Sequence, residues 1–343
     1  MAISSLERVF TVLDRKEPDK MPLFLLVTMH GALDMGMSIP EYFSKAENVV
    51  EGQSRMLKRY GHDCLYSFLY APIEIEAWGG EVIFYNDGPP NSGRPFMDPR
   101  DIRSMEPPDV HSSPSLLKVL KVQRMLRECH GEETPIIGVA MSPFSLPVMQ
   151  MGFDKYLDIL LNDTETFWEL MSINERFCID WANAQMEAGA HAMIYFDPVS
   201  SVTIIPPELY VSTGKVVAQR TLKEIKGPTA THFASGRCLR ILDDVIDTGT
   251  SLAGVSGMEG LPDLLQKNAG RMTLFGGLNG VTMRRWTPKQ TALEVKRTIQ
   301  GAANGGGFIL SDNHGEIPWQ VPTDVLHNIA KAVNKYGHYP IAE

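Results

Sequence analysis

Near its C-terminal end the chain runs Phe308-Ile309-Leu310-Ser311-Asp312-Asn313-His314-Gly315-Glu316-Ile317-Pro318. An apolar run typical of a buried strand is followed directly by Asp, Asn, His and Glu within five positions. The stretch Pro228-Thr229-Ala230-Thr231-His232-Phe233 has the same form, a short strand that ends at a histidine. Parallel strands place such ends at one edge of a sheet, so we expect the two polar clusters to meet in one site.

Short apolar runs of this kind alternate with segments of helical spacing along the whole chain. The predicted strands are Pro22–Val27, Cys64–Leu69, Pro135–Met141, Ala192–Phe196, Pro228–Phe233, Ser251–Ser256, Met272–Gly276 and Gly307–Leu310. The predicted helices are Pro40–Tyr60, Ser113–Cys129, Thr164–Ala188, Pro206–Lys226, Arg237–Asp247, Leu261–Asn268, Pro288–Ala303 and Thr323–Tyr336. Eight strands with eight crossover helices predict a (β/α)₈ TIM barrel, and we interpret residues 1–343 as a single domain of this kind.

An open, doubly wound sheet is the alternative α/β architecture, but it usually carries a phosphate-binding glycine loop after an early strand. Here Gly305-Gly306-Gly307 precedes a strand, which is not that pattern. One segment, near residues 73–107, interrupts the alternation. Its first part, Ile73–Tyr85, predicts a short hairpin, and the proline-rich remainder predicts a loop that leans over the barrel mouth.

The net charge of −9 argues against binding to nucleic acid or to an anionic membrane, because both require a dense basic surface. A small molecule or another protein is the expected partner. The four cysteines form no CxxC pair and are interpreted as reduced thiols. With no apolar signal region and no run of 18 apolar residues, we expect a soluble, cytoplasmic protein that could pair as a homodimer.

His232 and His314 are the strongest candidates for a metal site. Neutral imidazoles beside carboxylates suit Zn²⁺, which could then activate a bound oxygen or sulfur. The alternative is that each histidine only binds loop backbone. Asp197 and Glu316 also follow strands, and either could ligate metal or act as a general acid or base. Asp197 could equally cap the next turn, and Glu316 could be a solvated loop acid.

Other residues at the predicted strand ends could contact a substrate. Tyr66 and Tyr70 could stack on a planar ligand, although aromatic side chains at such positions also serve as core. The substrate-binding set that we expect is His30, Tyr66, Tyr70, Met141 and Asn313.

The chain resembles the uroporphyrinogen decarboxylase superfamily in several stretches that occur in the same order. These are Glu7–Pro22, Ile75-Glu76-Ala77-Trp78-Gly79-Gly80-Glu81-Val82, Glu187-Ala188-Gly189-Ala190 ahead of Asp197-Pro198, and the closing Asn313-His314-Gly315-Glu316-Ile317-Pro318. The resemblance covers nearly the whole chain and implies a (β/α)₈ barrel.

The resemblance implies two activities, and the chain departs from both patterns. True uroporphyrinogen decarboxylases carry an Arg-Gln-Ala-Gly-Arg-Tyr segment after the first strand that clamps substrate carboxylates. Here Val27-Thr28-Met29-His30-Gly31-Ala32 holds no arginine. The corrinoid methyltransferase branch binds zinc through His-x-Cys and a second Cys. Here His232 matches, Ala234 replaces the first Cys, and His314 falls at or beside the second, so zinc would need recruited ligands such as Glu316 or Asp197.

The resemblance therefore implies, as our leading hypothesis, a corrinoid-dependent methyltransferase. It would move a methyl group from a methoxylated, aromatic small molecule to the cob(I)alamin of a separate corrinoid protein, because this chain has no Asp-x-His-x-x-Gly motif of its own. Zinc, or a protonated His314 or Glu316, would polarise the ether oxygen. The alternatives are methyl transfer from methylcobalamin to a thiol or tetrahydrofolate, uroporphyrinogen decarboxylation, and a non-catalytic binding subunit.

Overall fold

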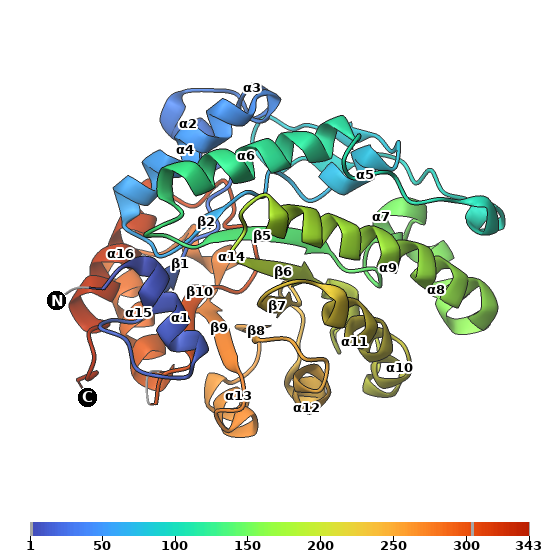
Figure 1. Cartoon of the computed structure of the whole chain (residues 1–343). Coiled ribbons are helices and arrows are strands. Elements are labelled where there is room, and N and C mark those ends of the chain that lie inside the picture. Colours follow the sequence, from blue (N-terminus) through green and yellow to red (C-terminus); the bar gives the residue numbers. More distant parts are fainter. Residues whose placement is uncertain (1–2, 303–304, 343) are drawn as a thin grey trace.

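The computed structural model describes residues 3–302 and 305–342. A sheet of eight parallel strands curls into a barrel in the order β1-β10-β9-β8-β7-β6-β5-β2 (Figure 1). The strands are β1 Leu23–Phe24, β2 Leu65–Tyr66, β5 Ile136–Met141, β6 Ala192–Phe196, β7 Thr229–His232, β8 Leu252–Val255, β9 Thr273–Leu278 and β10 Phe308–Asp312. Each one lies in or overlaps a predicted run, and the (β/α)₈ barrel is confirmed.

Helices cover the outside of the sheet (Figure 1). The longer ones are α1 Ser5–Leu13, α4 Ala46–Tyr60, α6 Pro114–His130, α8 Phe153–Asn162, α9 Thr164–Glu187, α11 Gly214–Glu224, α13 Leu261–Asn268, α15 Pro288–Ala302 and α16 Thr323–Tyr336. Shorter ones are α2 His30–Met35, α3 Ile39–Ser44, α5 Ile73–Ala77, α7 Pro147–Met151, α10 Pro207–Ser212, α12 Leu242–Ile246 and α14 Gly280–Met283. No helix in these described ranges has both the length and the apolar character needed to cross a membrane.

Helix boundaries differ from the predicted ones where a residue caps or interrupts a helix. The segment predicted as Pro40–Tyr60 is two helices, because Lys45 between α3 and α4 has an extended backbone. The segment Pro206–Lys226 divides in the same way at Thr213. Ala303, the last residue of the predicted helix Pro288–Ala303, lies outside the described residues.

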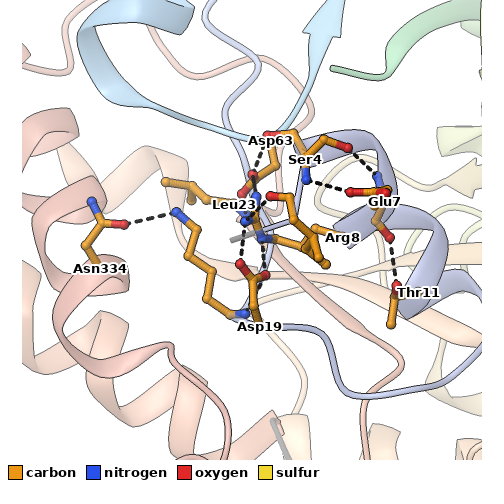
Figure 2. Close-up of polar contacts among 11 residues, drawn as sticks. Ser4, Glu7, Arg8, Thr11, Asp19, Leu23, Asp63 and Asn334 are labelled. Carbon is orange, nitrogen blue, oxygen red and sulfur yellow. Dashed lines mark hydrogen bonds and ion pairs between the residues drawn. The ribbon is translucent and has the colours of Figure 1, made fainter. Parts of the chain in front are cut away.

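A buried ionic network closes the base of the barrel, between the two shortest strands (Figure 2). Asp63 donates its backbone N–H to the Leu23 carbonyl (2.7 Å) and accepts the Leu23 N–H on Oδ2 (2.9 Å). Its Oδ1 atom accepts from Arg8 Nη1 at 2.6 Å, and Arg8 also binds Asp19 at 2.7 Å. The hydrogen bonds of Asp63 thus connect β1 and β2, two strands that are not paired with each other in the sheet.

The segment 73–107 is an excursion, but its first part is not a hairpin as predicted. Ile73–Ala77 form helix α5, and the hairpin consists of β3 Val82–Ile83 and β4 Asn91–Ser92, paired antiparallel. A 3₁₀ helix, Pro99–Ser104, follows. The tip of the hairpin borders the cavity described below, as expected for a loop over the barrel mouth.

Candidate active site

A cavity of about 390 Å³ lies at the carboxyl ends of the strands, under the hairpin. Most of its wall is apolar, with two carboxyl groups and two imidazoles. The lining contains no lysine or arginine. The residues are Leu26, Phe68, Ala71, Glu74, Pro89, Pro90, Asn91, Val139, Met141, Ile194, Phe196, His232, His314, Gly315 and Glu316. Four residues from the predicted site, Met141, His232, His314 and Glu316, therefore come together here.

His232 is held as a neutral ring between two phenyl rings. Its centroid lies 5.5 Å from that of Phe196 and 5.2 Å from that of Phe275. Burial, with a smaller contribution from the nearby His314, lowers the pKa of His232 to about 4. Its Nδ1 atom accepts the Ala234 backbone N–H at 2.9 Å. The neutral ring must then carry its proton on Nε2, which makes it a hydrogen-bond donor to a ligand.

His314 is half-buried and shares a hydrogen bond with Ser235 through Nδ1. Burial lowers the pKa of this imidazole. Gly315, the next residue, has a φ of +103°, and a Cβ atom there would lie 3.3 Å from Phe196. Only glycine adopts this conformation without strain, so the glycine brings the loop close over the rings of the cavity.

Zinc is the metal expected at His232 and His314. Whether these residues suit zinc depends on which of their ring nitrogens have a free lone pair. A histidine that binds zinc usually donates a hydrogen bond from its other ring nitrogen. In His232 the Nδ1 atom accepts one instead, so neither nitrogen of the neutral ring has a lone pair available. Within residues 3–302 and 305–342, no three His, Cys, Asp or Glu side chains form a group that could hold a metal ion. This arrangement does not fit zinc, whereas its acids are suited to proton transfer.

Glu316 is the first of two acids in the cavity that retain a proton at neutral pH. Its Oε1 atom is buried and has no hydrogen-bond partner in the described part of the chain. Burial, together with the negative charge of Asp312, raises the pKa of Glu316 to about 8. Asp312 lies behind it, where its carboxylate accepts the backbone N–H groups of His314 (3.2 Å) and Gly315 (3.3 Å). Burial also raises the pKa of Asp312, to about 7.

Glu74 is the second acid, and the sequence did not single it out. Only 4% of the residue is exposed, and Oε1 accepts the Met141 N–H at 2.9 Å. Burial raises its pKa to about 8, although Met141 and the neighbouring Trp181 both favour the ionised form. The hairpin predicted over Ile73–Tyr85 gave no reason to assign Glu74 to the site. The structure has helix α5 there instead, directly after Pro72.

Two of the predicted polar residues organise loops outside the cavity lining. Asp197 is buried, and its Oδ1 atom accepts hydrogen bonds from Ser142 (2.6 Å) and Ser145 (2.7 Å). Burial raises its pKa despite these bonds. The side-chain amide of Asn313 binds two backbone groups: it donates to the Leu278 carbonyl (2.7 Å) and accepts the Gly257 N–H (2.8 Å). Both residues tie neighbouring strand ends together.

The predicted substrate-binding residues His30, Tyr66 and Tyr70 also lie outside the lining. His30 is buried, with its ring 6.4 Å from that of Trp319, and burial lowers its pKa to about 4. Tyr66 packs in the apolar interior of the barrel. Tyr70 donates from its hydroxyl to Glu76 at 2.9 Å. Met141 is the one member of that predicted set that reaches the cavity.

The two buried glutamates predict that the protein loses stability as pH rises from about 6.5 to 8. In this range an unfolded glutamate is ionised, but Glu74 and Glu316 keep their protons in the folded state because their pKa values are near 8. Each therefore lowers the free energy of unfolding by up to about 1.4 kcal/mol per pH unit. Buried histidines such as His232 act in the opposite direction, but below about pH 6.5.

Urea unfolding at pH 6.5 and 8.0 measures this dependence. The Glu74→Gln and Glu316→Gln double variant should lose much less stability than the wild type over this interval. Equal losses for both proteins would show that the two carboxyl groups are already ionised at pH 6.5.

The sequence of this chain is similar to those of a known protein family. The family model for uroporphyrinogen decarboxylase (URO-D) matches residues 4–336. The uroporphyrinogen decarboxylase of Xylella fastidiosa is 26% identical over 359 aligned positions, covering 96% of this chain and 98% of that protein. That of Actinobacillus pleuropneumoniae is 23% identical and covers 96% and 98%.

Two solved structures show how widely the fold is shared. A methyltransferase from Methanosarcina mazei superposes with a TM-score of 0.88 at 20% identity, over 97% of this chain and 99% of that one. A B12-independent methionine synthase from Shewanella has a TM-score of 0.52 at 12% identity, with 93% of each chain covered. At these identities the two likenesses establish a common fold. The family match, which spans nearly all of the sequence, establishes more: the chain belongs to the uroporphyrinogen decarboxylase family.

Proposed function

We propose that this protein is a corrinoid-dependent methyltransferase, which takes a methyl group from an uncharged methoxyarene and delivers it to the cob(I)alamin of a separate corrinoid protein. The observation that carries the proposal is the apolar cavity with two protonated carboxyl groups, Glu74 and Glu316, and no cationic side chain. Such a cavity suits a neutral, flat molecule and can supply a proton to it.

The same cavity argues against uroporphyrinogen as the substrate. A tetrapyrrole with several carboxylates requires arginine or lysine partners, because buried anions without partners are strongly destabilised. The lining holds none, and the segment after β1, Val27-Thr28-Met29-His30, contributes none either. Family membership therefore accounts for the barrel fold, while the cavity lining favours a substrate other than uroporphyrinogen.

The proposed chemistry uses Glu316 as the general acid. When the methyl carbon leaves, the electron pair of the C–O bond stays on the oxygen, which takes the proton of Glu316 and departs as a phenol. The resulting carboxylate is protonated again from solvent. His232 can donate from Nε2 to the substrate, and the apolar wall excludes water. Cob(I)alamin, brought by the partner, would supply the nucleophile for the methyl group.

Exposed apolar side chains support a protein partner at the mouth. Leu33, Tyr85, Met258 and Val281 are between 45% and 60% exposed. Leu33, Met258 and Val281 follow strands β1, β8 and β9, and Tyr85 lies in the hairpin between β3 and β4. Apolar surface of this kind favours contact with another protein. The fold shared with a protein described as a methyltransferase supports the same assignment.

The test is a methyl-transfer assay with chemically reduced free cob(I)alamin in place of the unidentified partner. The purified protein is mixed with a panel of methoxyarenes, and methylcobalamin absorbance and released phenol are followed together. We expect both products in equal amounts. A parallel incubation with uroporphyrinogen, analysed for loss of carboxyl groups, should yield nothing. Decarboxylation there, without methylcobalamin from any methoxyarene, would overturn the proposal.

A further inference from the structure

Glu74 has a hydrogen-bonding capacity that the proposed proton donation by Glu316 does not use. The carboxyl lines the cavity, yet it comes from α5 and not from a strand end. Its Oε1 atom is occupied by the Met141 N–H, whereas Oε2 is buried with no hydrogen-bond partner in residues 3–302 and 305–342. A buried polar atom without a partner is destabilising unless a ligand satisfies it.

The neighbours of Glu74 show what kind of partner Oε2 lacks. Both nearby polar groups, the Met141 N–H and the Trp181 indole N–H, are donors. Trp181 Nε1 is itself buried without a hydrogen bond in the described structure. A protonated carboxyl needs an acceptor for its own proton, and neither neighbour can be one. Because Glu74 lines the cavity, a ligand bound there is the candidate source of this acceptor.

We propose that Glu74 is a specificity-determining residue that donates a hydrogen bond to a second oxygen substituent on the ring of the substrate. This assignment rests on the proposed function, because it takes a methoxyarene as the ligand. It separates the two acids: Glu316 gives up its proton to the reacting oxygen, while Glu74 keeps its proton and selects aromatic ethers with another oxygen over those with none.

Two substitutions at Glu74 separate hydrogen bonding from packing. Glu74→Gln keeps an oxygen that can accept the Met141 N–H and an amide that can donate to the ligand. Glu74→Leu has a similar volume and can do neither. Glu316→Gln is the matched control, because it alters the other acid of the same cavity and leaves Glu74 in place.

The experiment compares equilibrium binding of methoxybenzene with that of the 2-, 3- and 4-methoxyphenols, by calorimetry at pH 7 without any corrinoid. We expect the wild type to bind at least one methoxyphenol more tightly than methoxybenzene by about fivefold or more. Glu74→Gln and Glu316→Gln should keep this preference, and Glu74→Leu should lose it. A preference that persists in Glu74→Leu, or is absent from the wild type, would overturn the assignment.

Infrared difference spectroscopy tests the same contact should Glu74→Leu fail to fold. In Glu316→Gln, where Glu74 is the protonated acid left in the cavity lining, binding of the preferred methoxyphenol should shift the C=O stretch of a protonated carboxyl, and the shift should be missing in the Glu74→Gln and Glu316→Gln double variant. An unchanged spectrum on binding would contradict the proposal. These binding measurements involve no methyl transfer, so the two proposals can fail separately. If the protein binds methoxyphenols selectively but never forms methylcobalamin, the Glu74 contact stands and only the proposed function is refuted. If it transfers methyl groups without this selectivity, the proposed function stands and the role of Glu74 is refuted.

Discussion

Replacing Glu316 by glutamine is expected to lower the turnover of a methoxyarene by about 10²- to 10⁴-fold, the usual contribution of a general acid. Glutamine has the size of the glutamic acid and can still donate a hydrogen bond to bound substrate. It cannot release a proton to the leaving oxygen, so kcat should fall while the substrate Kd changes little.

The pH profile adds a signature that a structural role would not give. The pKa of Glu316 is near 8, so the wild-type kcat should fall as pH rises through about 8 and the proton is lost. Glu316→Gln should be slow and insensitive to pH in this range. Asp87→Asn, which changes an exposed carboxyl in the hairpin between β3 and β4, is the control and should behave as the wild type. A Glu316→Gln enzyme that keeps more than about a tenth of the turnover would refute the role.

Replacing Asp63 by alanine is expected to lower the free energy of unfolding by about 3–5 kcal/mol, as for other buried pairs that lose one partner. Asp63 is 1% exposed and Arg8 is 6% exposed. Removing the carboxylate leaves the Arg8 guanidinium with Asp19 as its carboxylate partner and leaves the Leu23 N–H without its acceptor.

Urea unfolding at pH 7 gives the magnitude, and an exposed ion pair provides the comparison. The Arg100 side chain is 87% exposed where it contacts Asp98, so Arg100→Ala should change the stability by less than about 1 kcal/mol. If Asp63→Ala loses no more than Arg100→Ala, the network at the barrel base does not hold the seam between β1 and β2.

The barrel could be predicted from sequence because its strands are short apolar runs separated by helices of clear periodicity. The strand Ala192–Phe196 has the predicted bounds, and β7, Thr229–His232, is one residue shorter at each end than the predicted run Pro228–Phe233. Such strands are recognisable because both of their sides are buried. Short helices on the loops, such as α2 and α7, were not predicted. Each is only one or two turns long, and its stability depends on tertiary contacts more than on its own residues.

The candidate site was predicted only where the strand end alone determines the direction of the side chain. His232, the last residue of β7, and His314, just after β10, both reach the cavity. Tyr66 also ends a strand, but its ring faces the apolar interior of the barrel. Glu74 could not be found in this way, because its position depends on the Met141 N–H, which is contributed by a strand far away in the sequence.

The contacts at the barrel base, which join the two ends of the chain, also have a consequence for its synthesis. Lys20 contacts Asn334, 314 residues later, and Leu23 pairs with Leu310. At translation rates of 5–20 residues per second, roughly 15–60 s separate the emergence of these partners from the ribosome. Throughout that interval β1 has an open edge on which other chains could pair. Nascent copies of this protein should therefore depend on chaperones until the last strand has left the exit tunnel.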